Sequence, residues 1–192
     1  MYPFSFDLHN GAHFFADAAV TEEDEKQRRY LNTAALLFAA ATIEAVLNEQ
    51  ISLRSEMGSD VHLSHLPCEF FEALAHAQKT ISLKDKWNLF TSVRGGRTWD
   101  SGSEPFQTYD LLISLRNELV HYKAEFLADR RAPVNKLQPL VDRLGIKPPP
   151  PDDEKYYSHW LQTLLGSADL GAWVRKSLDY AEVLGAVLKR VP

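Results

Sequence analysis

The chain has 192 residues, of which 45% are hydrophobic and 24% are charged. This composition is typical of a globular protein and excludes a disordered or fibrous chain. A single cysteine excludes a disulfide framework, so we expect a cytoplasmic location. A net charge of −5 excludes indiscriminate binding to nucleic acid or to an anionic membrane, so any nucleic-acid chemistry must come from a local patch.

The first twenty residues, 1–20, begin with aromatic side chains and lack a basic flank followed by an apolar core. We therefore expect an N-terminal extension rather than a signal peptide. The most apolar stretch, residues 34–43, is about half as long as a membrane span and is followed directly by Glu44. We expect it to be a buried helix of a soluble protein, with no membrane partner.

The next part of the chain predicts three helices. Thr21 precedes three acidic residues, as is typical of a helix start, and residues 21–54 contain no glycine or proline. This stretch predicts one helix of roughly thirty residues. Apolar residues at helical spacing predict a second helix over 67–79. Ser82 is expected to cap a third helix, over 83–94.

The remaining part of the chain predicts a fourth helix over 104–128, with large apolar residues along one side. Residues 130–154 are rich in proline and predict an extended connection with one short helix over 137–144. A last helix is predicted over 170–189. Because no alternating strand pattern is present, the predicted fold class is all-α. We expect an up-and-down bundle of four to five main helices in a single domain, residues 21–192.

The most distinctive segment lies inside the predicted fourth helix, where residues 114–123 have the sequence SLRNELVHYK. Arg116 stands directly before Asn117 and five positions before His121 in this otherwise apolar helix. The pattern resembles the R-x4-6-H motif of HEPN domains, in which a polar residue commonly follows the arginine. Residues 42–49, with the sequence TIEAVLNE, resemble the acidic and amide-bearing helix that faces this motif in some bacterial HEPN-like proteins.

The resemblance extends over residues 22–190 and implies a HEPN-like helical bundle. It also implies a metal-independent endoribonuclease of toxin or defence type that needs no cofactor, forms a homodimer, and has RNA and an antitoxin or other protein as partners. In such nucleases the ribose 2′-hydroxyl attacks the adjacent phosphorus. Carried over to this chain, His121 moves protons, Arg116 stabilises the phosphorane charge, and Asn117 orients the histidine or the phosphate.

Helix geometry restricts how the three motif residues meet. At about 100° per residue, Arg116 and His121 point roughly 140° apart around the axis, whereas Asn117 and His121 share one face. The arginine must therefore curl around the helix or serve a site that another chain completes. A two-fold composite site would concentrate positive charge in one cleft, and Arg94 and Arg97 are candidates to extend it.

Four further residues are expected to support the site. Glu44 and Asn48 share a helix face at spacing i, i+4, where they orient the arginine or the histidine, or form a polar pair in a helix seam. Lys123 is expected to extend the positive patch. Tyr122 directly follows the histidine, whereas a tyrosine stands two places after it in the nucleotidyltransferase-associated toxin branch. Tyr122 therefore departs from the modifiable tyrosine of that branch.

Two alternatives do not require catalysis. The chain could be a non-catalytic HEPN-like helical dimer that binds a nucleotide or a protein. Alternatively, the same residues could form a structural polar network, with Arg116 paired with Glu44 and His121 satisfied by Asn117 or Asn48. A purely structural role predicts that Arg116→Ala costs several kcal/mol if the arginine is half of a buried ion pair.

One other group of residues has the chemistry of metal ligands. His62, His65 and Cys68 stand at a spacing of three, and His9 or His13 would supply a fourth ligand if the N-terminal segment folded over them. The spacing matches no established zinc framework. We therefore expect no metal, and ordinary loop histidines with a buried cysteine.

Overall fold

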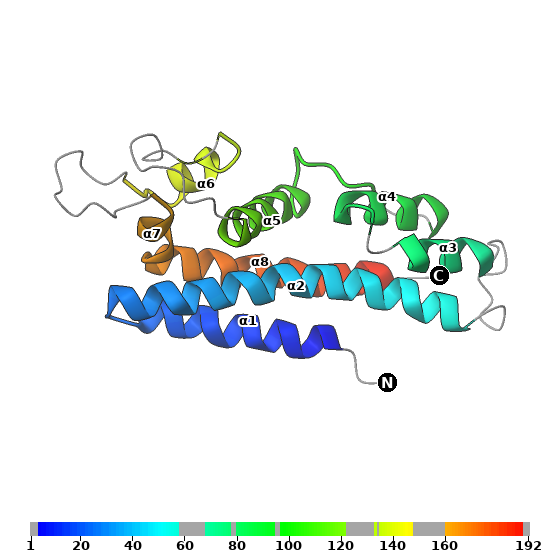
Figure 1. The fold of residues 1–192 in the computed structure, drawn as a ribbon, viewed down its shortest axis with the longest axis horizontal. Helices are drawn as coiled ribbons and strands as arrows, with labels where there is room; N and C mark the ends of the chain where they lie inside the picture. Colours follow the sequence, from blue (N-terminus) through cyan, green and yellow to red (C-terminus); the bar gives the residue numbers. More distant parts are fainter. Residues whose placement is uncertain are drawn as a thin grey trace.

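The computed structural model describes residues 4–57, 68–77, 80–94, 97–121, 133, 135–147 and 160–189. Within these ranges, only the backbone is described for Arg54, Glu56, Met57, Cys68, Glu69, Phe71, Val93, Arg94 and residues 181–189. The described residues form eight α-helices and no strand (Figure 1). These are α1 (Phe4–Thr21), α2 (Glu25–Met57), α3 (Cys68–Ala77), α4 (Leu83–Arg94), α5 (Phe106–Val120), α6 (Gln138–Arg143), α7 (Trp160–Leu165) and α8 (Ala168–Lys189).

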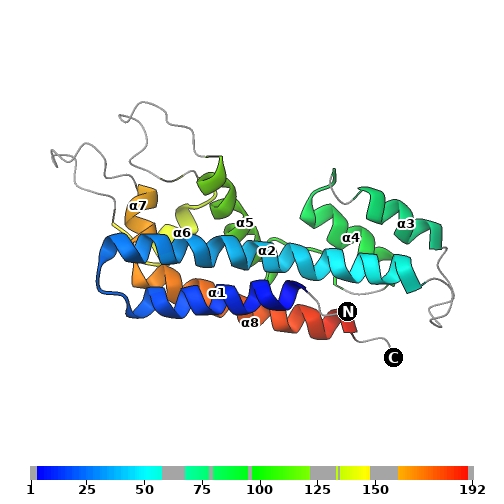
Figure 2. The same ribbon diagram turned by 60° about the horizontal axis from the view of Figure 1, so that its bottom comes forward.

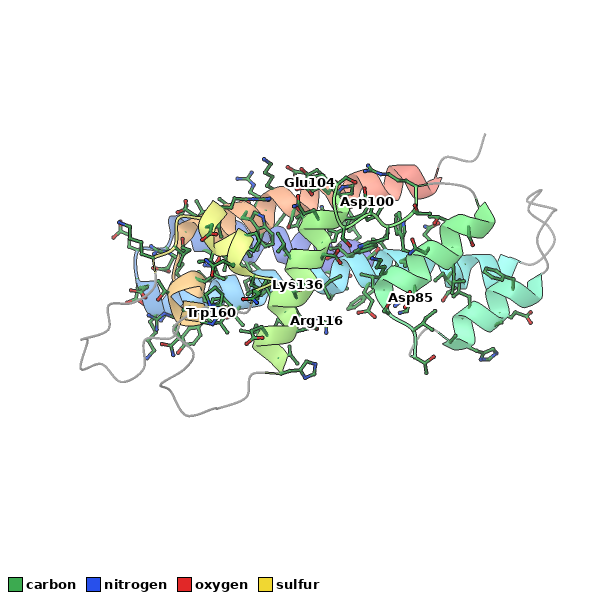
Figure 3. The ribbon with its side chains drawn as sticks, turned by 90° about the horizontal axis from the view of Figure 1, so that it is seen from above. Asp85, Asp100, Glu104, Arg116, Lys136 and Trp160 are labelled. Atoms are coloured by element: carbon green, nitrogen blue, oxygen red, sulfur yellow. The ribbon has the colours of Figure 1, made fainter. Side chains whose placement is uncertain are left out.

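Three long helices form the body of the molecule. α1, α2 and α8 lie lengthwise against one another, and α2 extends from one end of the fold to the other (Figure 1 and Figure 2). α3 and α4 cover one end of α2, whereas α6 and α7 lie toward its other end. Between these two groups, α5 crosses the long helices steeply (Figure 3). The all-α class is thus confirmed, although α5 does not run up or down alongside the others.

The middle of α2 is largely apolar, and neighbouring helices bury several of its side chains. Ala35, Leu36 and Ala39 are completely buried, and Leu47 is 1% exposed. In the part of the chain that the structure describes, one stretch, Glu25–Leu53, is long and apolar enough to cross a membrane. This stretch belongs to α2, which contacts α1, α5 and α8.

The N-terminal region, expected to be an extension, forms α1 and packs against α2 and α8. Its contact face consists of small residues, because Ala12, Ala16 and Ala19 are all fully buried. Small side chains allow helix axes to approach closely. At this junction a Cβ on Gly171 of α8 would lie 3.1 Å from the carbonyl oxygen of Ala16. The glycine therefore provides the space that the crossing needs.

The predicted start of the long helix at Thr21 is wrong. Thr21 is the last residue of α1, and its hydroxyl donates to the carbonyl oxygens of Asp17 and Ala18. The actual cap of α2 is Asp24, whose Oδ1 accepts the N–H of Gln27 at 2.8 Å. An acidic residue of the same short run therefore satisfies a free amide at the helix N-terminus.

The other helix predictions are confirmed where the structure describes them. The bounds of α3, α4, α6 and α8 all fall within two residues of the predicted bounds. Ser82 caps α4, because its Oγ accepts the N–H of Asp85 at 3.1 Å. α5 ends at Val120, and residues 122–128 of its predicted span lie outside the described residues. α7 was not predicted.

The start of α1 is tied to α2 by one carboxylate. Oε1 of Glu49 accepts the backbone N–H of Ser5 at 2.8 Å, and Oε2 accepts its hydroxyl at 2.5 Å. Glu49 thereby takes up a free amide at the N-terminus of α1, where the helix dipole favours a negative charge. Since Ser5 is 8% exposed, water has little access to replace these bonds.

We predict that Glu49→Ala lowers the free energy of unfolding by about 1–2 kcal/mol, the usual cost of losing a helix N-cap or a charge-assisted hydrogen bond. Urea denaturation followed by circular dichroism measures this change. Glu72→Ala, which removes an exposed carboxylate from α3, is the matched control and should stay within about 0.5 kcal/mol. Equal effects of the two substitutions would contradict the capping role.

Candidate functional site

α5 carries the predicted motif and presents it at its C-terminal end. Leu111, Leu112 and Leu115 are buried beneath the helix, which leaves Asn117 on the opposite, exposed side. His121 is the C-cap residue, and its N–H donates to the Asn117 carbonyl oxygen at 2.9 Å. The His121 side chain is exposed as well. Two of the three predicted catalytic residues therefore share one solvent-exposed face.

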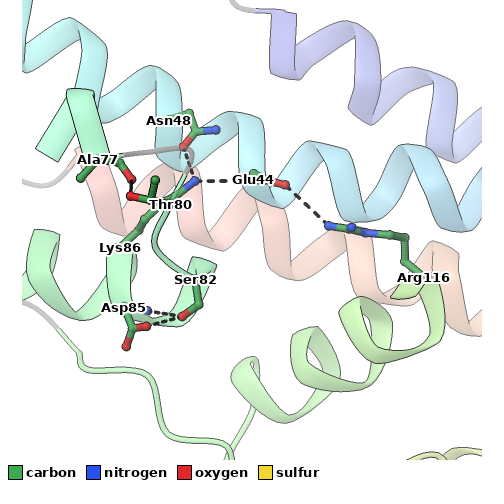
Figure 4. A network of polar contacts seen from close by, with 8 residues as sticks. All are labelled: Glu44, Asn48, Ala77, Thr80, Ser82, Asp85, Lys86 and Arg116. Atoms are coloured by element: carbon green, nitrogen blue, oxygen red, sulfur yellow. Dashed lines mark hydrogen bonds and ion pairs between the residues drawn. The ribbon is translucent and has the colours of Figure 1, made fainter. Parts of the chain in front are cut away.

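Arg116 instead extends from α5 toward α2 (Figure 3 and Figure 4). Its Nη2 lies 3.7 Å from Oε2 of Glu44, and the two side chains are 30% and 42% exposed. This separation is an ion pair but is too long for a hydrogen bond. The predicted pairing of Arg116 with Glu44 is thus present in the structure, and both partners remain in contact with solvent.

Glu44 has a second cationic partner that the sequence analysis missed. Nζ of Lys86, in α4, lies 3.4 Å from Oε1 of Glu44 and 3.2 Å from Oδ1 of Asn48 (Figure 4). The Lys86 side chain is only 2% exposed. We name Glu44, Asn48, Lys86 and Arg116 the α2–α4–α5 cluster. It joins three helices through one carboxylate and one amide.

The α2–α4–α5 cluster places Asn48 beside Lys86. Sequence spacing indicated that Asn48 would either orient Arg116 or His121 or form a polar pair with Glu44 in a helix seam. In the structure its side-chain oxygen accepts from Lys86 instead. This contact agrees with the helix-seam alternative, and the described contact of Asn48 is with Lys86 rather than with His121. The other two supporting residues, Tyr122 and Lys123, lie outside the described residues.

The position of Lys86 follows from how α4 begins and packs. Ser82 and Asp85 form a reciprocal cap that fixes the first turn, and the indole N–H of Trp87 donates to the Arg97 carbonyl oxygen at 2.8 Å. Lys86 stands four residues before Phe90, which is fully buried. Residues at this spacing lie on one helix face. Lys86 therefore borders the apolar stripe of α4 and reaches α2.

Arg97, expected to extend the positive patch, lies elsewhere. Its guanidinium donates to the Glu104 carbonyl oxygen at 3.0 Å and to the Ser103 hydroxyl. It also lies 5.5 Å from the ring centre of Phe106, the first residue of α5. Because His121 follows the last residue of α5, Arg97 stands at the opposite end of the helix. The Arg94 side chain lies outside what the structure describes.

Two titratable groups at the start of α5 and in the loop before it have shifted pKa values. Burial raises the pKa of Tyr109, with a smaller contribution from nearby Tyr180. The pKa of Asp100 is lowered by a hydrogen bond from Ser103 and by the N–H of Gly102. These two groups organise the loop before α5 and the aromatic packing beneath it.

Among the described residues, no three His, Cys, Asp or Glu side chains gather in a way that would hold a metal ion. The rings of His9 and His13 lie 4.5 Å apart along α1. His62 and His65, two of the predicted metal-ligand candidates, lie outside the described residues, as does the Cys68 side chain.

The α2–α4–α5 cluster can attract an anion. Its three formal charges sum to +1, because Glu44 carries −1 and Lys86 and Arg116 carry +1 each. Lys86 is buried, so Arg116 is the cation of the cluster that solvent can reach. A guanidinium that is always charged and presents a fork of donors suits the recognition of a phosphate.

We predict that Arg116→Ala lowers the free energy of unfolding by less than about 1 kcal/mol, because exposed ion pairs contribute little. Glu44→Ala should cost about 1–3 kcal/mol, since it leaves the buried Lys86 ammonium with one described acceptor. Urea denaturation of both variants checks this order. A loss of several kcal/mol from Arg116→Ala would instead indicate the purely structural role.

Comparisons with known proteins give no match to this chain. No protein-family model, no curated protein sequence and no solved structure matches it. The site is therefore interpreted from its own residues, and the resemblance of residues 114–123 to the HEPN motif stays a prediction.

Proposed function

We propose that this protein is a HEPN-like, metal-independent endoribonuclease, with Arg116, Asn117 and His121 as its catalytic residues. The observation that carries the proposal is the accessibility of all three side chains. Asn117 and His121 are exposed, and Arg116 is 30% exposed with no hydrogen bond to Glu44. A structural network would more commonly bury such groups and use all of their donors.

The proposed reaction uses proton transfer and charge stabilisation. His121 removes the proton of a ribose 2′-hydroxyl, whose oxygen attacks the adjacent phosphorus. The bond from phosphorus to the 5′-oxygen then breaks. A second imidazole, in its protonated form, gives a proton to that leaving oxygen. The products are a 2′,3′-cyclic phosphate and a free 5′-hydroxyl, and Arg116 stabilises the charge that develops on the phosphorane oxygens.

A homodimer supplies the second imidazole. Within one protomer Arg116 extends toward α2, whereas His121 lies on the exposed side of α5, and no contact joins these two described side chains. Val120, between Asn117 and His121, is 56% exposed. We propose that this end of α5 meets its counterpart in a second copy of the chain, so that each site combines residues of both. A toxin or defence role, with a cognate antitoxin, is the corresponding biological proposal.

A second candidate is a non-catalytic HEPN-like dimer that binds nucleotides or another protein through the same cluster. The ion pair between Arg116 and Glu44 favours it, because a paired arginine can hold a phosphate without promoting its reaction. The two candidates agree on the binding residue and differ in whether His121 contributes to turnover.

We predict that the purified protein cleaves RNA in EDTA and leaves cyclic-phosphate ends. His121→Ala should lower the cleavage rate by about a hundred- to ten-thousand-fold, the usual contribution of a general acid–base group. Because His121 is exposed, the substitution should leave the Tm nearly unchanged. Labelled RNA resolved on gels, with analysis of the ends, measures both rate and chemistry.

His76→Ala is the matched control, since His76 is also an exposed histidine near the end of a helix. It should retain the full cleavage rate. Full activity in His121→Ala would refute the nuclease assignment. RNA binding without any cleavage by the unmodified protein would establish the non-catalytic candidate in its place.

A further inference from the structure

Lys86 is the most deeply buried charged side chain among those that the structure describes. It is 2% exposed, although its helix, α4, lies on the outside of the fold. Moving an ammonium group out of water is costly unless acceptors replace the lost hydration. Its described acceptors are Oε1 of Glu44 and Oδ1 of Asn48. Both belong to α2, so the ammonium is held by one helix face.

The carboxylate of Glu44 is divided between two cations. Its Oε1 lies 3.4 Å from Nζ of Lys86, and its Oε2 lies 3.7 Å from Nη2 of Arg116. A carboxylate facing a single guanidinium commonly approaches it closely, often through two parallel hydrogen bonds. Here the carboxylate also faces the lysine, and among the described residues it forms no hydrogen bond with the guanidinium.

We infer that Lys86 is a positioning residue that holds Glu44 back from Arg116 and so keeps the Arg116 guanidinium available for an RNA phosphate. The effect on RNA binding rests on the proposed function. The claim that Lys86 holds Glu44 back from Arg116 rests only on the carboxylate that the two cations share. Without the lysine, the pair formed by Glu44 and Arg116 would carry no net charge. The carboxylate would then compete directly with phosphate for the arginine.

The first test is the crystal structure of Lys86→Met, which keeps the length of the side chain and removes its charge. We expect Oε2 of Glu44 to move into hydrogen-bond distance of the Arg116 guanidinium, about 2.7–2.9 Å. A separation that stays at 3.7 Å or lengthens would overturn the inference. This readout is independent of any RNA.

The second test is the affinity for a short single-stranded RNA with 2′-O-methyl riboses, which cannot be cleaved, measured by fluorescence anisotropy. Lys86→Met should weaken binding about tenfold. In a Glu44→Gln background, the same substitution should change the affinity by less than about twofold, because no carboxylate is left to compete. A merely structural role of Lys86 would not be rescued by Glu44→Gln, so persistence of the tenfold loss would overturn the inference.

Arg116→Ala separates the failure of this inference from the failure of the proposed function. If Arg116→Ala does not change the affinity of the otherwise unmodified protein, the proposed RNA site fails, while the crystal structure of Lys86→Met still decides whether the lysine positions Glu44. If Arg116→Ala weakens binding and Lys86→Met does not, the site stands and the role of Lys86 is refuted. Lys84→Met, an exposed lysine of the same helix, is the matched control.

Discussion

The shared carboxylate of Glu44 is the interaction on which the polar centre of this fold depends. It offsets the cost of burying the Lys86 ammonium, and it pairs with Arg116 across the seam between α2 and α5. Because one group serves both cations, neither pair can change without the other. The packing of α2, α4 and α5 is thereby linked to the charge that the Arg116 guanidinium presents to solvent.

Much of the fold could be predicted from local signals. Ser82 was identified as a cap from its neighbours alone, and the long glycine-free stretch indicated α2. α1 was missed because its buried face consists of alanines such as Ala12 and Ala16, which give a weak apolar pattern. Its packing depends on close approach to α2 and α8, which no local window contains. Thr21 was misassigned as the cap because threonine and aspartate are both favourable N-cap residues, and the cap is Asp24, three residues later.

Part of the site could also be predicted from local sequence signals. The pairing of Arg116 with Glu44 followed from the polar residues on two otherwise apolar helices. Lys86 was missed because a lysine beside Trp87 fits a solvated helix edge as well as a buried position. The signal that would have pointed to it is the pair Glu44 and Asn48, two acceptors one turn apart on an otherwise apolar helix. The docking of α4 onto α2 brings the Lys86 ammonium to both acceptors, and no local window of sequence contains that contact.

The fold and the proposed chemistry meet at Arg116, where an ion pair too long for a hydrogen bond leaves a cation within reach of solvent. The most direct measurement is a nitrogen-15 NMR titration of the arginine side chains with a short, uncleavable RNA. The account predicts that the guanidinium signals of Arg116 shift and saturate as RNA is added, while those of Arg97, at the other end of α5, stay in place. Arg116 signals that do not move at saturating RNA would contradict it.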